Sequence, residues 1–466
     1  MRTSPLKRMT RLLPLTLGLV LAGCSGSDDD DERKPSADAG TDAGTGGNTD
    51  AGTGGNTDAG TGGNTDAGTG GNTDGGTQPS ACLGDSFLKS LGKDRLLVGA
   101  KMTDTTAGSA PFDVRYIYLS SGMVDSTNVC TSCTSGCTAQ GQTCANAGCF
   151  WWGCWQDTAV APGNTVRLLI SGSRSRGQIP FITYYVQLLG SGRQEGAEQL
   201  GVLNDVNFMR RYFNDWRFAL QQVGNAQALL HLEPDLWGYL QFNSNNGEPR
   251  STPAQVATAN ATDCAGQENN ASGFARCMIA MARKYAPNAK VGLHASPWAT
   301  RIDVYLNTNA SFDVAGEARK VADFLLKLGA ADTDFIAVEA ADRDAGWYEV
   351  NRGEDTWWDA TNATRPNFHQ AFAWAKALSE RLNKPNFWWQ LPVGNMNMPN
   401  SDDRWRDNRV DYFFTHTAEV AAAHSVGFAF GSGTEDSTTK PEEDGGNLVN
   451  RVRAYKNAGG QRLCNP

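Results

Sequence analysis

Long hydrophobic runs, basic clusters and histidines are all scarce in this 466-residue sequence. The longest apolar stretch, around Leu12–Leu21, is short and interrupted by Pro14, so it does not predict a spanning helix. No cluster of Lys or Arg marks a basic face, and the formal net charge is −9, which argues against nucleic acid as a partner. The five histidines show no H-E-x-x-H or comparable ligand spacing, so we expect no metal and no cofactor.

Several catalytic motifs are also missing. No G-x-S-x-G nucleophile elbow occurs, since Gly172–Gly177 has the wrong spacing. A phosphate-binding loop and a dinucleotide fingerprint are absent as well, and Gly99–Asp104, after the first predicted strand, is not a Gly-rich phosphate turn. These absences argue against serine hydrolases and nucleotide-dependent enzymes.

The first 24 residues are typical of an exported bacterial lipoprotein. Basic residues precede the apolar run, and Leu21-Ala22-Gly23-Cys24 has the small residues of a lipobox. We therefore expect a signal peptide at 1–24 and lipidation at Cys24, which anchors the chain to a membrane. Ser25 after the cysteine resembles the pattern that sorts lipoproteins to the outer membrane of Gram-negative bacteria.

Residues 25–80 have almost no apolar side chains. The octapeptide T-D-A-G-T-G-G-N recurs from Thr41, Thr49, Thr57 and Thr65. Such a composition cannot bury enough surface to offset the entropy of ordering, so it predicts a disordered linker. A calcium-binding solenoid would need a nine-residue repeat with a regular apolar position, and neither is present.

Residues 81–466 alternate strand-like and helix-like segments, which predicts an α/β fold, a (β/α)8 TIM barrel. An open doubly wound sheet is the alternative. The eight predicted strands are Leu96–Ala100, Val114–Leu119, Ile179–Leu189, one ending at Leu232, Lys290–Leu293, Asp334–Glu339, Asn386–Leu391 and Val426–Phe430. The predicted helices are Val206–Val223, Phe274–Tyr285, Glu317–Leu328, Phe368–Leu382, Thr415–His424 and Leu448–Asn457. We expect the domain to be a monomer.

Ten cysteines remain after Cys24, an even number that favours disulfides in an oxidising compartment. Cys82 and Cys464 bracket the domain and could join its two ends. Cys264 and Cys277 could close the loop before a helix. The other six crowd an insertion after the second strand, at about 124–157, and their pairing stays open; Cys130-x2-Cys133 leaves zinc as the weaker alternative.

The fourth strand carries the strongest chemical signal. Ala228–Phe242 reads A-L-L-H-L-E-P-D-L-W-G-Y-L-Q-F, so a buried run ends in Glu233, Pro234 and Asp235. Acids at the carboxyl end of a buried strand lie where barrel active sites are built. The sixth strand ends at Glu339, with Asp342 beyond it. Glycoside hydrolysis needs one protonated and one ionised carboxyl group, so we expect Glu233 as general acid and Glu339 as its partner, with Asp235 able to replace either.

Aromatic side chains strengthen this hypothesis, because rings stack on sugar faces. Polar groups at strand ends could hold sugar hydroxyls. The alternative role of the acids is ion pairing, and the alternative role of the aromatics is core packing. The candidate substrate contacts are Trp237, His294, Trp298, Tyr185, Gln390, Asp342, Trp151 and Trp152.

Glu233-Pro234 followed by Trp-Gly-Tyr resembles the large clan of (β/α)8 glycoside hydrolases with Asn-Glu-Pro at the fourth strand. That resemblance implies an acid/base role for Glu233, but Leu232 replaces the asparagine and Gln390, at the end of the seventh strand, stands where the clan has its second glutamate. The triplet is also similar to that of inverting cellulases, which implies that Asp235 is the acid. A third clan pairs carboxylates of strands four and six, which implies Glu233 or Asp235 with Glu339 or Asp342. The expected function is hydrolysis of an extracellular polysaccharide, or glycan binding without catalysis.

Overall fold

The computed structural model describes residues 82–120, 163–244, 247–431, 433 and 436–463, together with the backbone of three two-residue strands, β3 (Cys133–Thr134), β4 (Thr138–Ala139) and β5 (Gln142–Thr143). The predicted signal peptide, the linker, Trp151 and Trp152 lie outside these residues. Among the described residues, no helix is long and apolar enough to cross a membrane.

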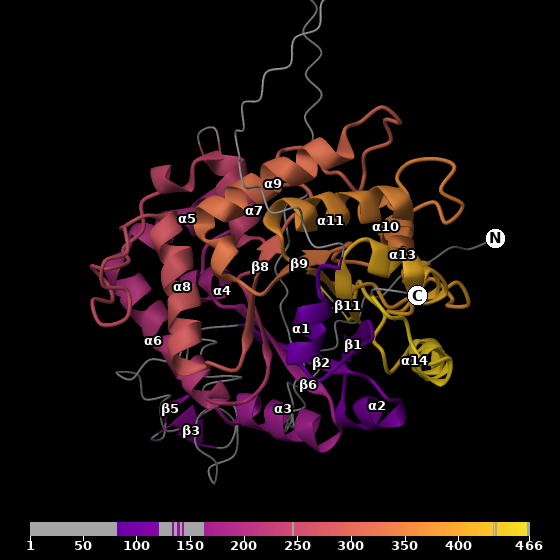
Figure 1. Cartoon of the computed structure of the whole chain (residues 1–466), viewed down its shortest axis with the longest axis horizontal. Helices are drawn as coiled ribbons and strands as arrows, with labels where there is room; N and C mark the ends of the chain where they lie inside the picture. Colours follow the sequence, from indigo (N-terminus) through magenta and orange to yellow (C-terminus); the bar gives the residue numbers. More distant parts are fainter. Residues whose placement is uncertain are drawn as a thin grey trace, which may run out of the picture.

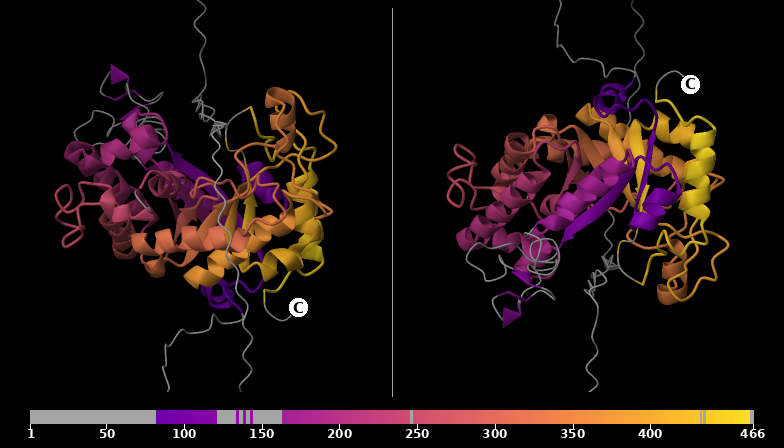
Figure 2. Two further views of the ribbon diagram at one scale, coloured as in Figure 1. Left: turned by 90° about the horizontal axis from the view of Figure 1, so that it is seen from above. Right: turned by 90° about the horizontal axis from the view of Figure 1, so that it is seen from below.

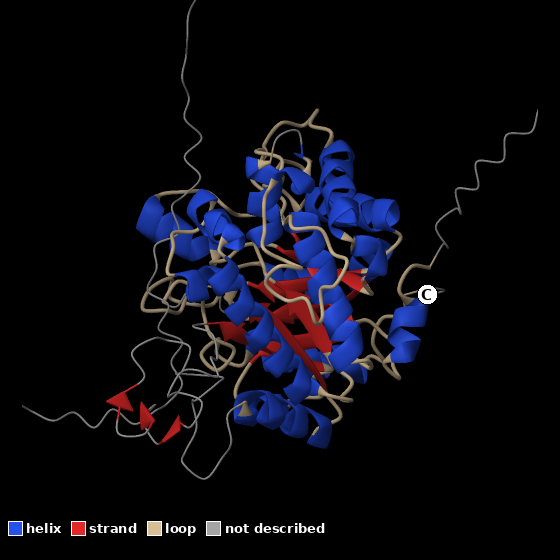
Figure 3. Ribbon diagram, turned by 90° about the vertical axis from the view of Figure 1, so that its left-hand side faces the viewer, coloured by secondary structure: helices blue, strands red, loops and turns tan. Residues whose placement is uncertain are grey.

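Eight parallel strands close into a barrel, as Figure 3 shows with the strands enclosed by helices. This confirms the predicted (β/α)8 fold. Around the barrel, the order is β1-β11-β10-β9-β8-β7-β6-β2. The strands are β1 (Leu97–Lys101), β2 (Val114–Ser120), β6 (Ile179–Tyr185), β7 (Leu229–Leu232), β8 (Lys290–Ala295), β9 (Phe335–Glu339), β10 (Asn386–Leu391) and β11 (Ser425–Phe430).

The helices follow one another around the strands in chain order, except α1, which lies over one end of the barrel (Figure 1). They are α1 (Asp85–Ser90), α2 (Asp104–Ser109), α3 (Asn164–Ser175), α4 (Gln187–Ser191), α5 (Ala197–Gly201), α6 (Val206–Val223), α7 (Leu236–Asn243), α8 (Ala271–Tyr285), α9 (Val314–Leu328), α10 (Ala345–Arg352), α11 (Phe368–Leu382), α12 (Arg409–Thr415), α13 (Thr417–Ala422) and α14 (Asn447–Asn457).

Most predicted elements agree with these bounds to within three residues, and the structure departs from the sequence predictions at two places. The third strand ends at Tyr185 rather than at Leu189, because the amide N–H groups of Val186 and Gln187 donate to the side chain of Glu233, which follows β7, and α4 begins. The helix predicted at Thr415–His424 corresponds to the shorter α13, and the preceding α12 was not predicted; His416 between the two helices has a non-helical backbone (φ −122°, ψ 36°).

Side chains alternate along the strands, as the period of two requires. On β7, Leu229 points into the barrel, whereas Leu230 and Leu232 belong to the layer between strands and helices. The amino-terminal end of the barrel is closed by α1, whose Phe87 ring packs 5.8 Å from that of Phe335. In Figure 2, α1 (indigo) and α10 (orange) lie on opposite sides of the strands, so the opposite, carboxyl end is where the loops after the strands gather.

A disulfide joins Cys264 to Cys277, as the sequence predicted. It ties the loop before α8 to that helix. Cys464 and the six cysteines of the predicted insertion lie outside the residues whose side chains the structure describes, so their pairings stay predictions.

Candidate active site

The backbone after β7 separates the two acids of the Glu-Pro-Asp triplet. Glu233 (φ 42°) and Asp235 (φ 66°) both adopt the left-handed region, which side-chain-bearing residues rarely occupy. Each such residue costs about 1–3 kcal/mol and persists where the surroundings impose it, often at functional sites. These two left-handed residues, one on each side of Pro234, direct the two carboxyl groups into different environments.

Glu233 faces the helix layer. Its Oε1 accepts hydrogen bonds from the Tyr212 hydroxyl of α6 (2.6 Å) and from the amides of Gln187 (3.0 Å) and Val186 (3.2 Å). The side chain has no exposed surface, and Oε2 has no hydrogen-bond partner among the described residues. Burial raises the pKa of Glu233 to about 8, although these three hydrogen bonds lower it.

Asp235, His294 and Glu339 come together at the carboxyl ends of three neighbouring strands. One oxygen of each acid and one ring nitrogen of His294 all lie within 4.8 Å of one another. Asp235 follows β7, His294 is on β8 and Glu339 ends β9. All three are buried, with 6%, 0% and 8% of their surface exposed. The structure therefore brings together Asp235 and Glu339, the sequence-predicted pair in which Asp235 replaces Glu233.

His294 is backed by a second buried histidine inside the barrel. His231 Nε2 lies 3.1 Å from His294 Nδ1, and His231 Nδ1 lies 3.3 Å from the Thr183 hydroxyl. The two imidazole rings stack with centroids 5.2 Å apart, and the Trp389 ring packs edge-on at 4.7 Å from His231. Burial, and then the neighbouring His294, hold the pKa of His231 well below its usual range, so His231 is neutral.

A second group of polar side chains lies beyond the end of β9. Asp342 accepts a hydrogen bond from the Tyr348 hydroxyl (2.6 Å) and pairs with Arg343. Burial and the charge of Asp342 help to raise the pKa of nearby Asp303 to about 6. The buried Tyr305 hydroxyl has no hydrogen-bond partner among the described residues, and burial, Asp303 and Glu339 raise its pKa. Tyr305 therefore lies close to both acids.

The remaining predicted sugar contacts differ in exposure. Tyr185 and Trp298 are half-buried; Tyr185 donates to Glu195 (3.1 Å), and Trp298 packs against Tyr239. Gln390 is 4% exposed with φ 54°. Trp237 lies in the core, where its indole N–H donates to the Leu232 carbonyl (2.7 Å), so it has no free face for a sugar ring.

Sequence reasoning did not assign roles to Thr183, His231 or Tyr305, and it offered Arg343 only as an ion-pair partner of the acids. The alternation along β7 places His231 on the inward face two residues before Glu233, which is a usable signal. Tyr305 and Arg343 lie in loops and carry no comparable pattern.

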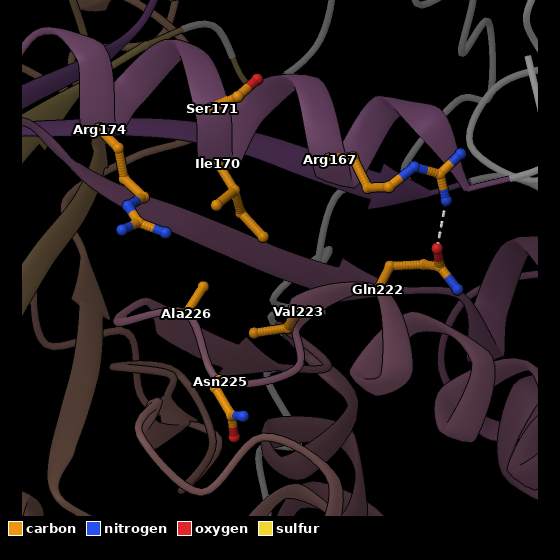
Figure 4. Close-up of a pocket in the computed structure, with 8 residues that line it drawn as sticks. All are labelled: Arg167, Ile170, Ser171, Arg174, Gln222, Val223, Asn225 and Ala226. Atoms are coloured by element: carbon orange, nitrogen blue, oxygen red, sulfur yellow. Dashed lines mark hydrogen bonds between the residues drawn. The ribbon is translucent and has the colours of Figure 1, made fainter.

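A hollow of about 500 Å³ lies outside the barrel, between α3 and the end of α6 (Figure 4). Arg167 and Arg174 of α3 line one side, and Val223 and Asn225 line the other. Because Asn225 precedes β7, this hollow lies toward the amino-terminal end of that strand, away from Asp235.

No family model matches this sequence, and no curated protein matches it. Similar solved structures include a xyloglucan-specific beta-1,4-glucanase of glycoside hydrolase family 5 from a ruminal metagenomic library (12% identity, TM-score 0.45, covering 84% of this chain and 95% of that one). A Cellulomonas fimi endo-beta-1,4-mannanase gives 11% identity, TM-score 0.44, and coverage of 84% and 75%.

The endoglucanase Cel6 from Mycobacterium tuberculosis is similar over a smaller part (13% identity, TM-score 0.25, 48% of this chain). That match spans 55% of the endoglucanase chain. At such identities and TM-scores, the similarity does not establish an activity for this chain.

Proposed function

We propose that this domain hydrolyses O-glycosidic bonds of a polysaccharide, with Asp235 and Glu339 as the two catalytic carboxyl groups. The observation that carries the proposal is their separation, because one oxygen of each lies within 4.8 Å of the other. Retaining glycosidases hold their carboxyl groups about 5–5.5 Å apart, whereas inverting enzymes leave about 6.5–9.5 Å for a water molecule. An upper limit of 4.8 Å between one oxygen of each acid lies nearer the retaining range than the inverting one, so we expect retention of configuration.

The surroundings support different roles for the two acids. The charge of Glu339 acts on the buried Tyr305 hydroxyl, a donor with no hydrogen-bond partner among the described residues. A hydrogen bond from that hydroxyl would stabilise an ionised carboxylate, which suits a nucleophile. Asp235 then serves as acid and base, the role that its place in the Glu-Pro-Asp triplet also implies.

The reaction has two steps. Asp235 donates its proton to the glycosidic oxygen while a Glu339 oxygen attacks the anomeric carbon, which releases the leaving sugar and forms a glycosyl ester. Asp235, now ionised, takes a proton from water as that water attacks the same carbon. The ester bond breaks, Glu339 is released as a carboxylate, and Asp235 is protonated again. His294 lies close enough to both acids to help hold them in place.

The test uses the anomeric configuration and chemical rescue. A panel of glucans, mannans, xylans and bacterial polysaccharides is screened for cleavage, and the new reducing end is followed by NMR. The initial product should have the configuration of the substrate. In Glu339→Ala, azide should restore turnover of an activated aryl glycoside and give a glycosyl azide of inverted configuration. Inversion by the wild type, or full activity of Glu339→Ala, would reject these roles.

A glycan-binding protein without catalysis is the second candidate. One observation that favours it is Gln390 near the end of β10, because the glycoside hydrolases with Asn-Glu-Pro at the fourth strand have their second catalytic glutamate there. The other is the near-complete burial of Asp235 and Glu339. If wild type and Asp235→Asn bind the same glycan equally tightly and neither releases a reducing end, binding is the function.

We also propose that Cys24 anchors the chain to the bacterial outer membrane, so that the linker holds the domain away from the lipid surface. The lipobox sequence supports this proposal. Cells fed a radiolabelled fatty acid should label the wild type but not Cys24→Ala. Equal labelling of the two proteins would exclude Cys24 as the acceptor.

A further inference from the structure

The Asp235–His294–Glu339 cluster has the donor atoms of a metal site. Three atoms that lie within 4.8 Å of one another can share a centre that is within about 2.8 Å of each. Side-chain rotations that move each atom by about 0.6–0.8 Å would bring these atoms to the roughly 2.0–2.2 Å of bonds to zinc. Two carboxylate oxygens and one imidazole nitrogen suit zinc or manganese better than a soft, thiol-seeking metal.

The support behind His294 resembles that of a metal ligand. Metal-binding histidines usually donate their other ring N–H to a neighbouring acceptor, which fixes the tautomer and the ring orientation. His294 Nδ1 contacts His231 Nε2, and His231 Nδ1 contacts Thr183 Oγ1. If each Nδ1 carries its proton, Nδ1–H of His294 donates to His231, Nδ1–H of His231 donates to Thr183, and His294 Nε2 presents its lone pair toward the acids.

Two buried donors beside the cluster have no hydrogen-bond partner among the described residues. Tyr305 is 3% exposed, and the charge of Glu339 acts on its hydroxyl. Trp389 Nε1 belongs to a ring whose centroid is 5.8 Å from that of His294, on the strand next to Glu339. Water or another oxygen ligand on a cation would offer acceptors to such donors.

We infer that Asp235, His294 and Glu339 bind one divalent transition-metal ion of the zinc or manganese class. His231 is a positioning residue that orients His294 for this ion. Because the ion would occupy the oxygens that hydrolysis needs, it would inhibit glycosidase activity in competition with substrate. The inhibition rests on the proposed function, whereas the binding does not.

The experiment measures binding without any substrate. The metal-free full chain is dialysed against Zn²⁺ and, separately, Mn²⁺, and bound metal is quantified by mass spectrometry. We expect one ion per chain that depends on the cluster, with affinity reduced at least about 100-fold in His294→Ala and about 10–100-fold in His231→Ala. Asp342→Asn, which changes an acid at the same end of the barrel but outside the cluster, should bind as the wild type does.

Two further measurements keep the test decisive if His294→Ala does not fold. Glu339→Gln changes one ligand atom with almost no change of shape and should also lose the ion, and the electron paramagnetic resonance spectrum of bound Mn²⁺ should change in His231→Ala. No bound ion in the folded wild type, or equal affinity in wild type and Glu339→Gln, would overturn the inference. Hydrolysis without metal binding would reject the metal site alone, and metal binding without hydrolysis would reject the proposed function alone.

Discussion

Glu233 and Asp235 are two residues apart, yet they lie in regions with different physical chemistry. Glu233 is enclosed by α6 and the start of α4, where three donors converge on one of its oxygens. Asp235 lies at the carboxyl end of the barrel, beside a histidine and a second carboxylate. The comparison teaches that a strongly raised pKa does not by itself identify a catalytic acid, because burial against a helix raises it just as well.

What the two regions do for the protein should therefore differ. In the Glu233 region, three hydrogen bonds anchor the first residue of the turn after β7, in which both Glu233 and Asp235 have a left-handed backbone. In the proposed mechanism, the cluster region carries the reacting groups. Mutations in the first should change stability, and mutations in the second should change turnover.

The largest expected effect concerns the cluster. Asp235→Asn and Glu339→Gln should each lower kcat at least about 10³-fold, since each removes a group that acts in bond cleavage. Their unfolding free energies should change by no more than about 1 kcal/mol, because the replacements keep the side-chain shape. The measurements are kcat on a cleaved polysaccharide and urea unfolding of the same preparations.

If Asp235→Asn keeps wild-type turnover while Glu233→Gln abolishes it, the two acids have the opposite roles, as the sequence first suggested. Loss of turnover in both would mean that the turn and the cluster cannot be separated functionally. A fold check by circular dichroism accompanies each variant.

The second effect is a pH dependence of stability caused by Glu233. Its pKa is about 8 in the folded protein against an ordinary value of 4.5. Below pH 4.5 the group is protonated in both states and contributes nothing. Between 4.5 and 8 the unfolded chain releases its proton first, so stability falls as pH rises, by about 5 kcal/mol at most above pH 8.

Glu233→Gln cannot ionise at this position and should lack that decline, with turnover within about threefold of wild type. Urea unfolding of both proteins at pH 5 and pH 8.5 measures the difference. Parallel stability profiles for the two proteins would show that Glu233 has an ordinary pKa in the folded state.

The fold was predictable because its signals are local. Apolar runs such as Asn386–Leu391 and helices such as Val206–Val223 and Phe368–Leu382 have the predicted bounds. Alternating strands and helices then leave few closed arrangements. Barrel active sites lie at the carboxyl ends of the strands, and this rule made Asp235, His294 and Glu339 candidates before their contacts were known.

The different surroundings of Glu233 and Asp235 were not predictable. Alternation along an ideal strand puts Glu233 and Asp235 on one face, but the left-handed backbone on both sides of Pro234 breaks that alternation. The Tyr212 hydroxyl that holds Glu233 comes from the preceding helix, 21 residues earlier. The three-residue donor set was equally hidden, because its members come from three strands and form no ligand motif.

The smallest expected effect tests whether the Glu233 region is a unit of its own. Tyr212→Phe removes the hydroxyl that donates to Glu233 at 2.6 Å and should cost about 1–2 kcal/mol of unfolding free energy. That hydrogen bond lowers the pKa of Glu233, so its loss should raise the pKa further and move the end of the stability decline to higher pH.

A double-mutant cycle of Tyr212→Phe with Glu233→Gln at pH 7 should give a coupling energy of about 1 kcal/mol, because the two side chains share one interaction. The matched cycle of Tyr212→Phe with Asp235→Asn should give a coupling within about 0.5 kcal/mol of zero, since Tyr212 contacts the acid before Pro234 and not the one after it. Strong coupling in the second cycle would show that the two regions are not independent. Glu233, held by Tyr212 of α6, would then set the position of Asp235 in the cluster.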